Sequence, residues 1–295
     1  MSLAVVARKD FEDAARSKML WAITALFVLT TAGGMYALNF LFDEQSATGA
    51  VQWLSAPASL VVPLAAIVVG YLAIAGERES GSIKILLGLP HTRRDVVLGK
   101  LVGRTGVVAV ATVVAFAVGA VVLLVQYGSL PLVEFALLGL LTFFFAMVFV
   151  GIAIGFSAFT KTRSRAMAGA IGIFFLFQFL WSFVPVAIYY LLEGSIPNPF
   201  AEPLPAWYFL LQLLNPSNAY GAASGLFIDS AGTQSVVVGP SGETTTGAAP
   251  SLADLVQGGT VPFYLDEWFS LVILAAWLVV PVAIGYWRFR DADLS

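Results

Sequence analysis

The sequence predicts an all-α integral membrane protein with six transmembrane helices, an N-terminal helix at the membrane interface and a long outer loop between spans five and six. Three observations predict this fold class: an apolar composition, six long apolar stretches, and basic residues confined to alternate loops. Of the 295 residues, 59% are hydrophobic and 11% are charged. Soluble domains carry about 45–50% apolar and about 25% charged residues. A soluble fold this apolar would expose large apolar patches to water.

Six stretches are long and apolar enough to cross a bilayer, which takes roughly 20 mostly apolar residues. They run approximately over residues 20–42, 58–75, 107–125, 132–156, 167–192 and 268–287. The first follows basic residues, as the core of a signal peptide does, but it exceeds the roughly 7–15 residues of such a core and no small-residue cleavage site follows it. We therefore expect a retained helix, and a single transmembrane domain over residues 1–295.

The basic residues orient the chain. All 15 Lys and Arg residues lie before the first span, between spans two and three, between spans four and five, or after span six. They are Arg8, Lys9, Arg16, Lys18, Arg78, Lys84, Arg93, Arg94, Lys100, Arg104, Lys161, Arg163, Arg165, Arg288 and Arg290. Cytoplasmic loops carry the excess of Lys and Arg in membrane proteins. We therefore expect a multi-pass protein of the plasma membrane with both termini in the cytoplasm.

Residues 1–19, ahead of the first span, have the pattern of an amphipathic helix. Apolar side chains can share one side while charged side chains stay in water. The apolar set is Val5, Val6, Phe11, Ala14 and Ala15, and the charged set is Arg8, Lys9, Glu12, Asp13 and Arg16. Such a helix lies in the membrane interface. A disordered leader is the alternative, and the periodicity favours the helix.

The outer loop, residues 193–267, is too long for a simple connector and contains no Lys or Arg. Its apolar run Trp207–Leu214 is too short to span, so we expect a helix that lies in the outer leaflet or dips into it. Within the 229–260 insertion, residues 233–250 are rich in turn residues, which predicts a small hairpin or a disordered tip. Ser251 with Asp254 three positions later predicts a capping box for a short helix.

Several functions are disfavoured by what the chain lacks. It has no cysteine, so it offers no disulfide framework and no Cys-based metal site. Its net charge of −3 argues against nucleic acid as a partner. The six spans contain essentially no ionisable residue, which a proton- or ion-coupled carrier needs. The single histidine, His91, lies across the membrane from Ser224 and cannot serve it as a general base. No phosphate-binding loop motif occurs, so we expect no cofactor and no enzymatic activity of its own.

The strongest functional signal lies in the cytoplasmic loop 76–106. Ser82–Leu89 is an apolar run of helix length that is too short to span. Thr92, with Asp95 three positions later, predicts the start of a second helix. A short apolar helix rimmed by charges suits docking into the groove of a partner protein. The alternative on physical grounds alone is that this helix lies on the lipid surface.

Three features carry a family resemblance: the opening ARKDFEDAARSKMLW, the loop string GERESGSIKILLGLP with RRDVVLGK two residues later, and six spans with a long fifth outer segment. With these features the chain resembles the type-2 ABC exporter permeases, and within them the NosY-like branch. The resemblance implies that residues 1–19 form an elbow helix and that residues 77–89 form a coupling helix seated in an ATP-binding subunit. It also implies two ABC ATPase subunits and a second permease, identical or homologous.

We therefore predict a permease subunit of an ABC exporter. Its predicted ATPase-coupling residues are Glu77, Arg78, Glu79, Ser80, Gly81, Ser82, Ile83, Ile85, Leu86, Leu87, Arg93 and Arg94. The main alternative is a membrane anchor that transmits conformational change to an extracytoplasmic partner without moving a substrate. A secondary carrier, a channel and a membrane enzyme are less favoured. An extracytoplasmic accessory protein is a further candidate partner, and nearly uncharged spans favour lipid-like, amphipathic, small neutral or sulfur-containing substrates.

Small residues and prolines give expectations about packing. Gly151 and Gly155 have the spacing that permits close helix approach, either inside the bundle or between subunits. Pro63, Pro185 and Pro281 each remove a backbone hydrogen bond and are expected to kink or loosen spans two, five and six.

Overall fold

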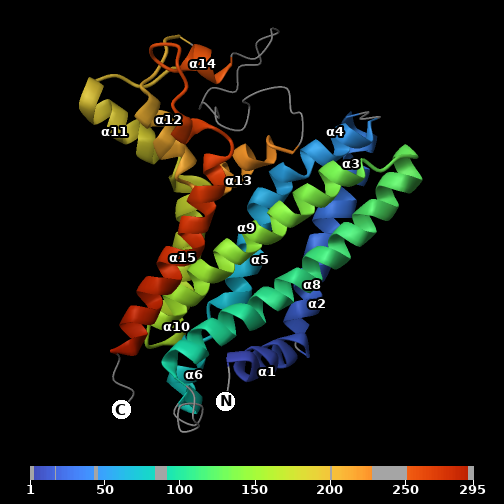
Figure 1. The fold of residues 1–295 in the computed structure, drawn as a ribbon, viewed down its shortest axis with the longest axis vertical. Helices are drawn as coiled ribbons and strands as arrows, with labels where there is room; N and C mark the ends of the chain where they lie inside the picture. Colours follow the sequence, from blue (N-terminus) through green and yellow to red (C-terminus); the bar gives the residue numbers. More distant parts are fainter. Residues whose placement is uncertain are drawn as a thin grey trace. The chain divides into compact units, whose positions relative to one another are not determined.

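The computed structural model describes residues 3–16, 18–42, 46–83, 92–199, 201–227 and 251–291, and this part of the chain is predominantly α-helical (Figure 1). The chain divides into two compact units. One, the bundle unit, comprises Met1–Phe174 and Ala275–Ser295, and the other, the loop unit, comprises Phe175–Leu274. The predicted coupling residues Ile85, Leu86 and Leu87 lie outside the described residues, as do positions 228–250 of the outer insertion.

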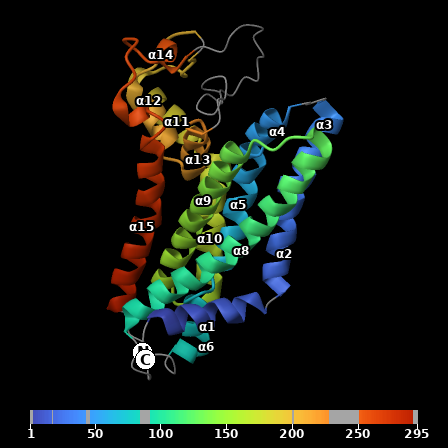
Figure 2. The same cartoon turned by 45° about the vertical axis from the view of Figure 1, so that its right-hand side comes forward.

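Long helices build the bundle unit. In chain order they are α1 (Leu3–Ala15), α2 (Lys18–Val28), the π-helix η1 (Leu29–Gly33), α3 (Gly34–Phe42), α4 (Ala47–Trp53), α5 (Ser55–Gly70), α6 (Ala75–Ser80), α8 (Arg93–Tyr127), α9 (Leu132–Phe159) and α10 (Arg163–Phe175), followed by the bundle part of α15 (Phe269–Arg290). Helix α8 packs against α2 and α9, α5 packs against α9, and α1 lies along α8 (Figure 2). Large apolar side chains of α9, including Phe145 and Phe149, are fully buried at the centre.

The structure supports a multi-pass helical membrane protein. Four helical stretches are long and apolar enough to cross a membrane, namely Ala47–Ser80, α8, α9 and α15. A fifth is present if Arg163–Leu180 and Phe183–Glu193, which meet at a bend of 61°, form one broken span. The predicted first span, residues 20–42, coincides with α2, η1 and α3, and its apolar helical part Trp21–Ala37 is shorter than a full span.

Two predicted boundaries differ from the observed helices. The second apolar helix begins at Ala47 and continues to Ser80, well beyond residues 58–75 on both sides. Helix α8 begins at Arg93, so the second half of the predicted loop 76–106 continues into the third span without a break. The predicted cap of this helix is confirmed: Thr92 Oγ1 accepts from the Asp95 amide at 3.1 Å, and Asp95 Oδ2 accepts from the Thr92 amide at 3.0 Å. A well-capped start permits a helix longer than the membrane requires.

Close approach between α9 and α15 takes place within the chain. A Cβ atom at Gly151 would lie 2.9 Å from Leu278 Cδ1, and one at Gly155 would overlap the backbone of Pro281. Gly285 meets the backbone of Gly155 in turn. The glycine pair therefore serves packing inside the bundle unit, one of the two uses expected for it.

The three prolines differ in whether they interrupt the helix that contains them. Pro63 and Pro281 lie inside α5 and α15, and both helices continue through them. The expected kink is observed near Pro185, because the bend precedes α11 (Phe183–Glu193). Pro185 has no N–H to bond the Trp181 carbonyl four residues back. That carbonyl instead accepts from the Val184 amide at 2.9 Å, in a tighter turn.

Short helices build the rest of the loop unit: α12 (Ala206–Leu213), α13 (Pro216–Ser224), α14 (Leu252–Leu255) and the 3₁₀-helix η3 (Phe263–Leu265). The expected short apolar helix after residue 205 is present as α12. The expected capping box of α14 is also present, with Ser251 Oγ and Asp254 Oδ2 each accepting from the other residue's amide. Asn215 caps α13 and donates to the Phe177 carbonyl at 2.6 Å.

Candidate coupling site

One end of the bundle unit gathers most of the chemistry of this chain. Helix α6, the start of α8 and the Arg290 end of α15 meet there, and α1 lies across them (Figures 1 and 2). We call this end the base. No group of three or more His, Asp or Glu side chains that could hold a metal ion occurs in the described part of the chain.

Helix α6 is anchored at its start and ends sharply. The hydroxyl of Ser157 on α9 accepts hydrogen bonds from the amides of Ile74 and Ala75 at 3.0 and 2.9 Å. These amides open the helix and would otherwise lack partners. The helix ends at Gly81, whose φ of 76° is left-handed and suits glycine.

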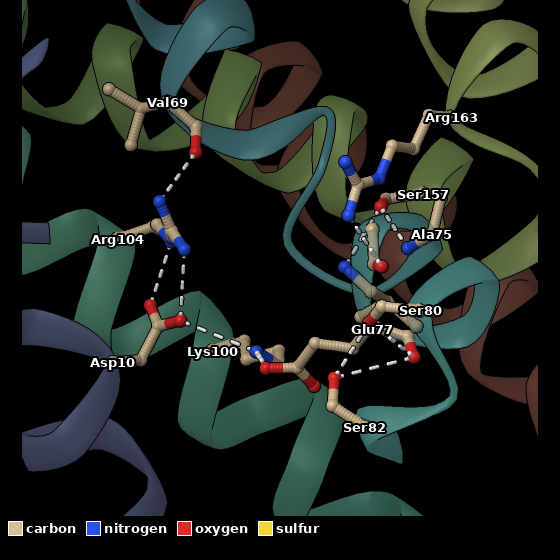
Figure 3. A network of polar contacts seen from close by, with 12 residues as sticks. Asp10, Val69, Ala75, Glu77, Ser80, Ser82, Lys100, Arg104, Ser157 and Arg163 are labelled. Carbon is tan, nitrogen blue, oxygen red and sulfur yellow. Dashed lines mark hydrogen bonds and ion pairs between the residues drawn. The ribbon is translucent and has the colours of Figure 1, made fainter. Parts of the chain in front are cut away.

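An ion-pair network whose central residues are buried joins α6 to α8 and α1 (Figure 3). Glu77 Oε1 accepts from Lys100 Nζ at 2.6 Å, and Asp10 Oδ1 lies 3.4 Å from the same nitrogen. Lys100 and Asp10 are only 3% and 6% exposed. Arg104 donates from a terminal nitrogen to Asp10 Oδ1 at 3.1 Å. Its Nε is 2.8 Å from Oδ2, but the N–H is not aimed at that oxygen, so this second contact is electrostatic.

Glycines on α8 let α1 come close enough for these ion pairs. A Cβ atom at Gly103 would lie 2.8 Å from the Ala7 carbonyl oxygen and 2.9 Å from Asp10 Oδ2. A Cβ atom at Gly99 would lie 2.7 Å from Val6 Cβ. These glycines are four positions apart, and so are Lys100 and Arg104, so each pair lies along one side of α8. Helix α1 is therefore a docked part of the bundle unit.

The amphipathic helix expected at the N-terminus is present, but its buried side differs from the expected one. The buried residues of α1 are Val6, Ala7, Asp10 and Ala14. Val5 is 47% exposed, although it was expected on the apolar side. Asp10 was missed because a buried carboxylate is recognised only through its partners. The signal that could have found it is the repeat of Gly99 and Gly103 beside two basic residues.

Three arginines of the base cap helix C-termini. Arg104 donates to the Val69 carbonyl near the end of α5 at 3.2 Å. Arg78 donates to the carbonyls of Ala158 and Thr160 at the end of α9, at 3.2 and 3.0 Å. Arg93 donates to the last carbonyls of α15. Cations are favourable at helix C-termini, where unbonded carbonyls carry partial negative charge.

Arg78 and Arg93 also share an aromatic partner. The Phe289 ring on α15 is fully buried, and the two guanidinium carbons lie 5.8 and 5.4 Å from its centroid. Glu79 accepts from the amide of Arg163, which opens α10. Arg163 in turn donates to the Gly76 carbonyl at 3.4 Å. The loop after α5 is thus bonded to α8, α9, α10 and α15.

The predicted coupling residues fall into three groups. Glu77, Arg78, Glu79 and Arg93 make the contacts within the base. Ser80, Ser82 and Arg94 are exposed, and the hydroxyls of Ser80 and Ser82 lie 3.0 Å apart. Ile83 is only 1% exposed and therefore packs within this chain. Among the described coupling residues that make no contact within the base, the exposed ones are therefore Ser80, Ser82 and Arg94.

The apolar membrane-length helices, with charged helix ends gathered at the base, define the general class as a multi-pass helical membrane protein. Residues 4–294 match the model of the family described as ABC-2 family transporter protein. The chain belongs to this family, which confirms the resemblance found in its sequence.

Two curated relatives are similar over almost the whole chain. The protein described as probable ABC transporter permease protein NosY from Stutzerimonas stutzeri is 30% identical over 292 residues, covering 97% of this chain and 96% of its own. The protein with the same description from Pseudomonas aeruginosa is 31% identical over 301 residues, with the same coverage.

Proposed function

We propose that this ABC-2 family protein is the permease subunit of an ABC exporter, that a separate subunit hydrolyses the ATP, and that the loop after α6 receives the force. One observation carries the proposal. Three consecutive residues of α6, the helix that leads into this loop, are bonded to different helices of the bundle unit: Glu77, Arg78 and Glu79. A loop that only connected two spans would not need such contacts. The descriptions of the NosY relatives support the permease assignment.

The contacts of the base would transmit a displacement of this loop to the helices that cross the membrane. Glu77 pairs with Lys100 on α8, which is also close to Asp10 on α1. Arg78 holds the ends of α9 and α15, and Glu79 holds the start of α10. Buried ion pairs resist separation, since removing one partner typically costs about 3–5 kcal/mol. Displacement of α6 would therefore be transmitted to these helices.

The six-span arrangement with a cytoplasmic base belongs to the same proposal. The described ends of α1 and α15 lie at the same end of the bundle unit (Figure 1). The Lys and Arg residues outside the spans favour the cytoplasm for this end. On this topology α1 is the elbow helix. The complex would contain two ATPase subunits and a second permease, identical or homologous.

The proposal places the substrate path at the contact with a second permease rather than in the small cavity described inside the bundle unit. The cavity lined by Phe27, Thr30, Thr31, Phe116, Thr142 and their neighbours has a volume of about 20 Å³. That is close to the minimum that holds one water molecule, about 10–15 Å³ on the same measure. It is too small for the lipid-like or small neutral substrates that the uncharged spans favour.

The decisive experiment alters the exposed turn at Ser80, whose hydroxyl bonds the Glu77 carbonyl and contacts the Ser82 hydroxyl, and leaves the ion pairs of the base in place. In Ser80→Arg a bulky cation occupies the surface on which the ATPase would sit. We expect affinity purification of the variant from cells that co-express the cognate ATPase to recover much less ATPase than the wild type does. Ser129→Arg, the same change in the exposed turn between α8 and α9, is the matched control. Equal ATPase recovery with both variants would overturn the coupling role of this loop.

Cysteine labelling checks the topology separately. Ser164→Cys and Ser129→Cys both place a thiol at an exposed position in a chain without cysteine. We expect a membrane-impermeant maleimide to label Ser129→Cys in intact cells and to label Ser164→Cys only after permeabilisation. The reverse pattern would contradict the cytoplasmic base, and labelling of both in intact cells would contradict six spans.

A further inference from the structure

The last turn of α15 carries a cation that the base does not use. The guanidinium carbon of Arg288 lies 5.4 Å from the ring centroid of Phe159 on α9 and 5.5 Å from that of Trp287. Both rings are about half exposed, at 50% and 55%. Stacking of this kind holds the guanidinium plane and leaves its N–H groups available to an anion.

The charge of Arg288 is not neutralised inside the described part of the chain, where no carboxylate lies within ion-pair distance of it. Arg290, two positions later, is neutralised, because Asp291 accepts from its Nε at 3.0 Å and from a terminal nitrogen at 3.4 Å. The two arginines are both exposed at the same helix end and differ in whether a carboxylate pairs with them. Both arginines are charged, but Asp291 competes with an outside anion for Arg290, and no carboxylate of the described part of the chain competes for Arg288.

An apolar stripe leads up to Arg288. Val280, Ile284 and Arg288 follow one another at intervals of four residues on α15, so they lie along one side of the helix. The two aliphatic side chains are 51% and 52% exposed. Because α15 is one of the helices that can cross a membrane, this stripe can contact lipid. A cation flanked by aromatic rings at the end of an apolar stripe matches the layout of a phospholipid, with its phosphate above its acyl chains.

We propose that Arg288, Phe159 and Trp287 bind the headgroup of an anionic phospholipid, whose acyl chain lies along Val280 and Ile284. The guanidinium binds the phosphate, and the two rings lie at the level of the headgroup. This site is independent of the coupling role of the base, because it requires only that α15 is embedded in the membrane.

Native mass spectrometry of the purified full-length chain tests the site, with phosphatidylglycerol and phosphatidylcholine of identical acyl chains as probes. The wild type should retain phosphatidylglycerol in preference to phosphatidylcholine. Arg288→Gln should retain about fivefold less phosphatidylglycerol, the factor expected for one basic residue at an anionic membrane surface. Arg290→Gln should retain as much as the wild type.

Further measurements distinguish a site for a phospholipid from a site for a simple anion. Inorganic phosphate in millimolar excess should leave the bound phosphatidylglycerol in place, and its displacement would show a simple anion site and overturn the proposal. Equal retention by Arg288→Gln and the wild type would also overturn it. Phe159→Leu removes one stacked ring at a half-exposed position and should lower retention in the same direction. That variant decides the question if Arg288→Gln does not purify as a monodisperse protein.

Discussion

The base of the bundle unit and the α12–α13 region of the loop unit both supply hydrogen-bond donors to backbone carbonyls of helices, but they use different side chains. In both regions a helix ends, or contains a π-helical turn such as η2 (Leu176–Leu180), and leaves backbone carbonyls that need hydrogen-bond donors. At the base the donors are the guanidinium groups of Arg78, Arg93 and Arg104. In the loop unit the donors are neutral. The Asn215 amide bonds the Phe177 carbonyl, and the Trp181 indole bonds the Leu211 carbonyl at 2.9 Å.

The difference follows from where the sequence places its charges. Residues 193–267 contain no Lys or Arg, so only amides, hydroxyls and ring N–H groups are available there. Hydrogen bonds to charged groups contribute about 1.5–3 kcal/mol, and neutral ones about 0.5–1.5 kcal/mol. The same asymmetry that orients the chain therefore makes the base the more tightly bonded region. A coupling site needs that rigidity.

Removal of the carboxylate at the centre of the base should have the largest effect. Asp10→Ala leaves the buried Lys100 and the partly buried Arg104 with less negative charge beside them, which should lower the free energy of unfolding by about 3–5 kcal/mol. Thermal unfolding in detergent measures the change, and hydrogen exchange of α1 amides should increase with it. Glu12→Ala on the same helix is the control, because its ion pair with Arg8 is exposed and should matter little. Similar losses in both variants would mean that burial does not strengthen the network.

Substitution of the glycines of α8 that contact α1 should have a smaller effect on stability, and the structure predicts its direction. Gly103→Ala puts a methyl group against Ala7 and Asp10, and overpacking of this kind costs about 1–3 kcal/mol. Gly172→Ala in α10 meets nothing within 4 Å and should stabilise the helix by about 0.5–1 kcal/mol. Melting temperatures should therefore shift in opposite directions. A stabilising Gly103→Ala would contradict the close approach of α1.

The smallest change is expected in the loop unit. Asn215→Ala removes the α13 cap and the bond to the Phe177 carbonyl, which should lower stability by about 0.5–2 kcal/mol. Asn215→Ser keeps an oxygen that can cap α13 but is too short to replace the amide donor. If the Phe177 bond contributes, thermal unfolding should place this variant between the wild type and Asn215→Ala. A loss as large as that of Asp10→Ala would contradict the proposed difference between the two regions.

Much of the fold could be predicted from residues that are close in the chain. The apolar stretches predicted long membrane helices, although the structure finds four to five candidates and extends two of them beyond the predicted ends. The caps at Thr92 and Ser251 and the break before Pro185 were predicted correctly. Each depends on a few neighbouring residues whose backbone preferences are local. The family resemblance also rests on contiguous strings, and it is confirmed by the family model.

The candidate site was predicted only in outline. The string from Glu77 to Arg94 was predicted to couple to an ATPase, which stays a prediction. The intrachain contacts of four of its charged residues were not predicted. Asp10 and Lys100 are 90 positions apart, and Arg78 and Thr160 are 82 apart. Hydropathy shows that such residues avoid lipid, but not which partner each one meets. Only the packing of α1 on the glycines of α8, and of α9 against α15, brings these groups together, because burial decides which charges must be paired.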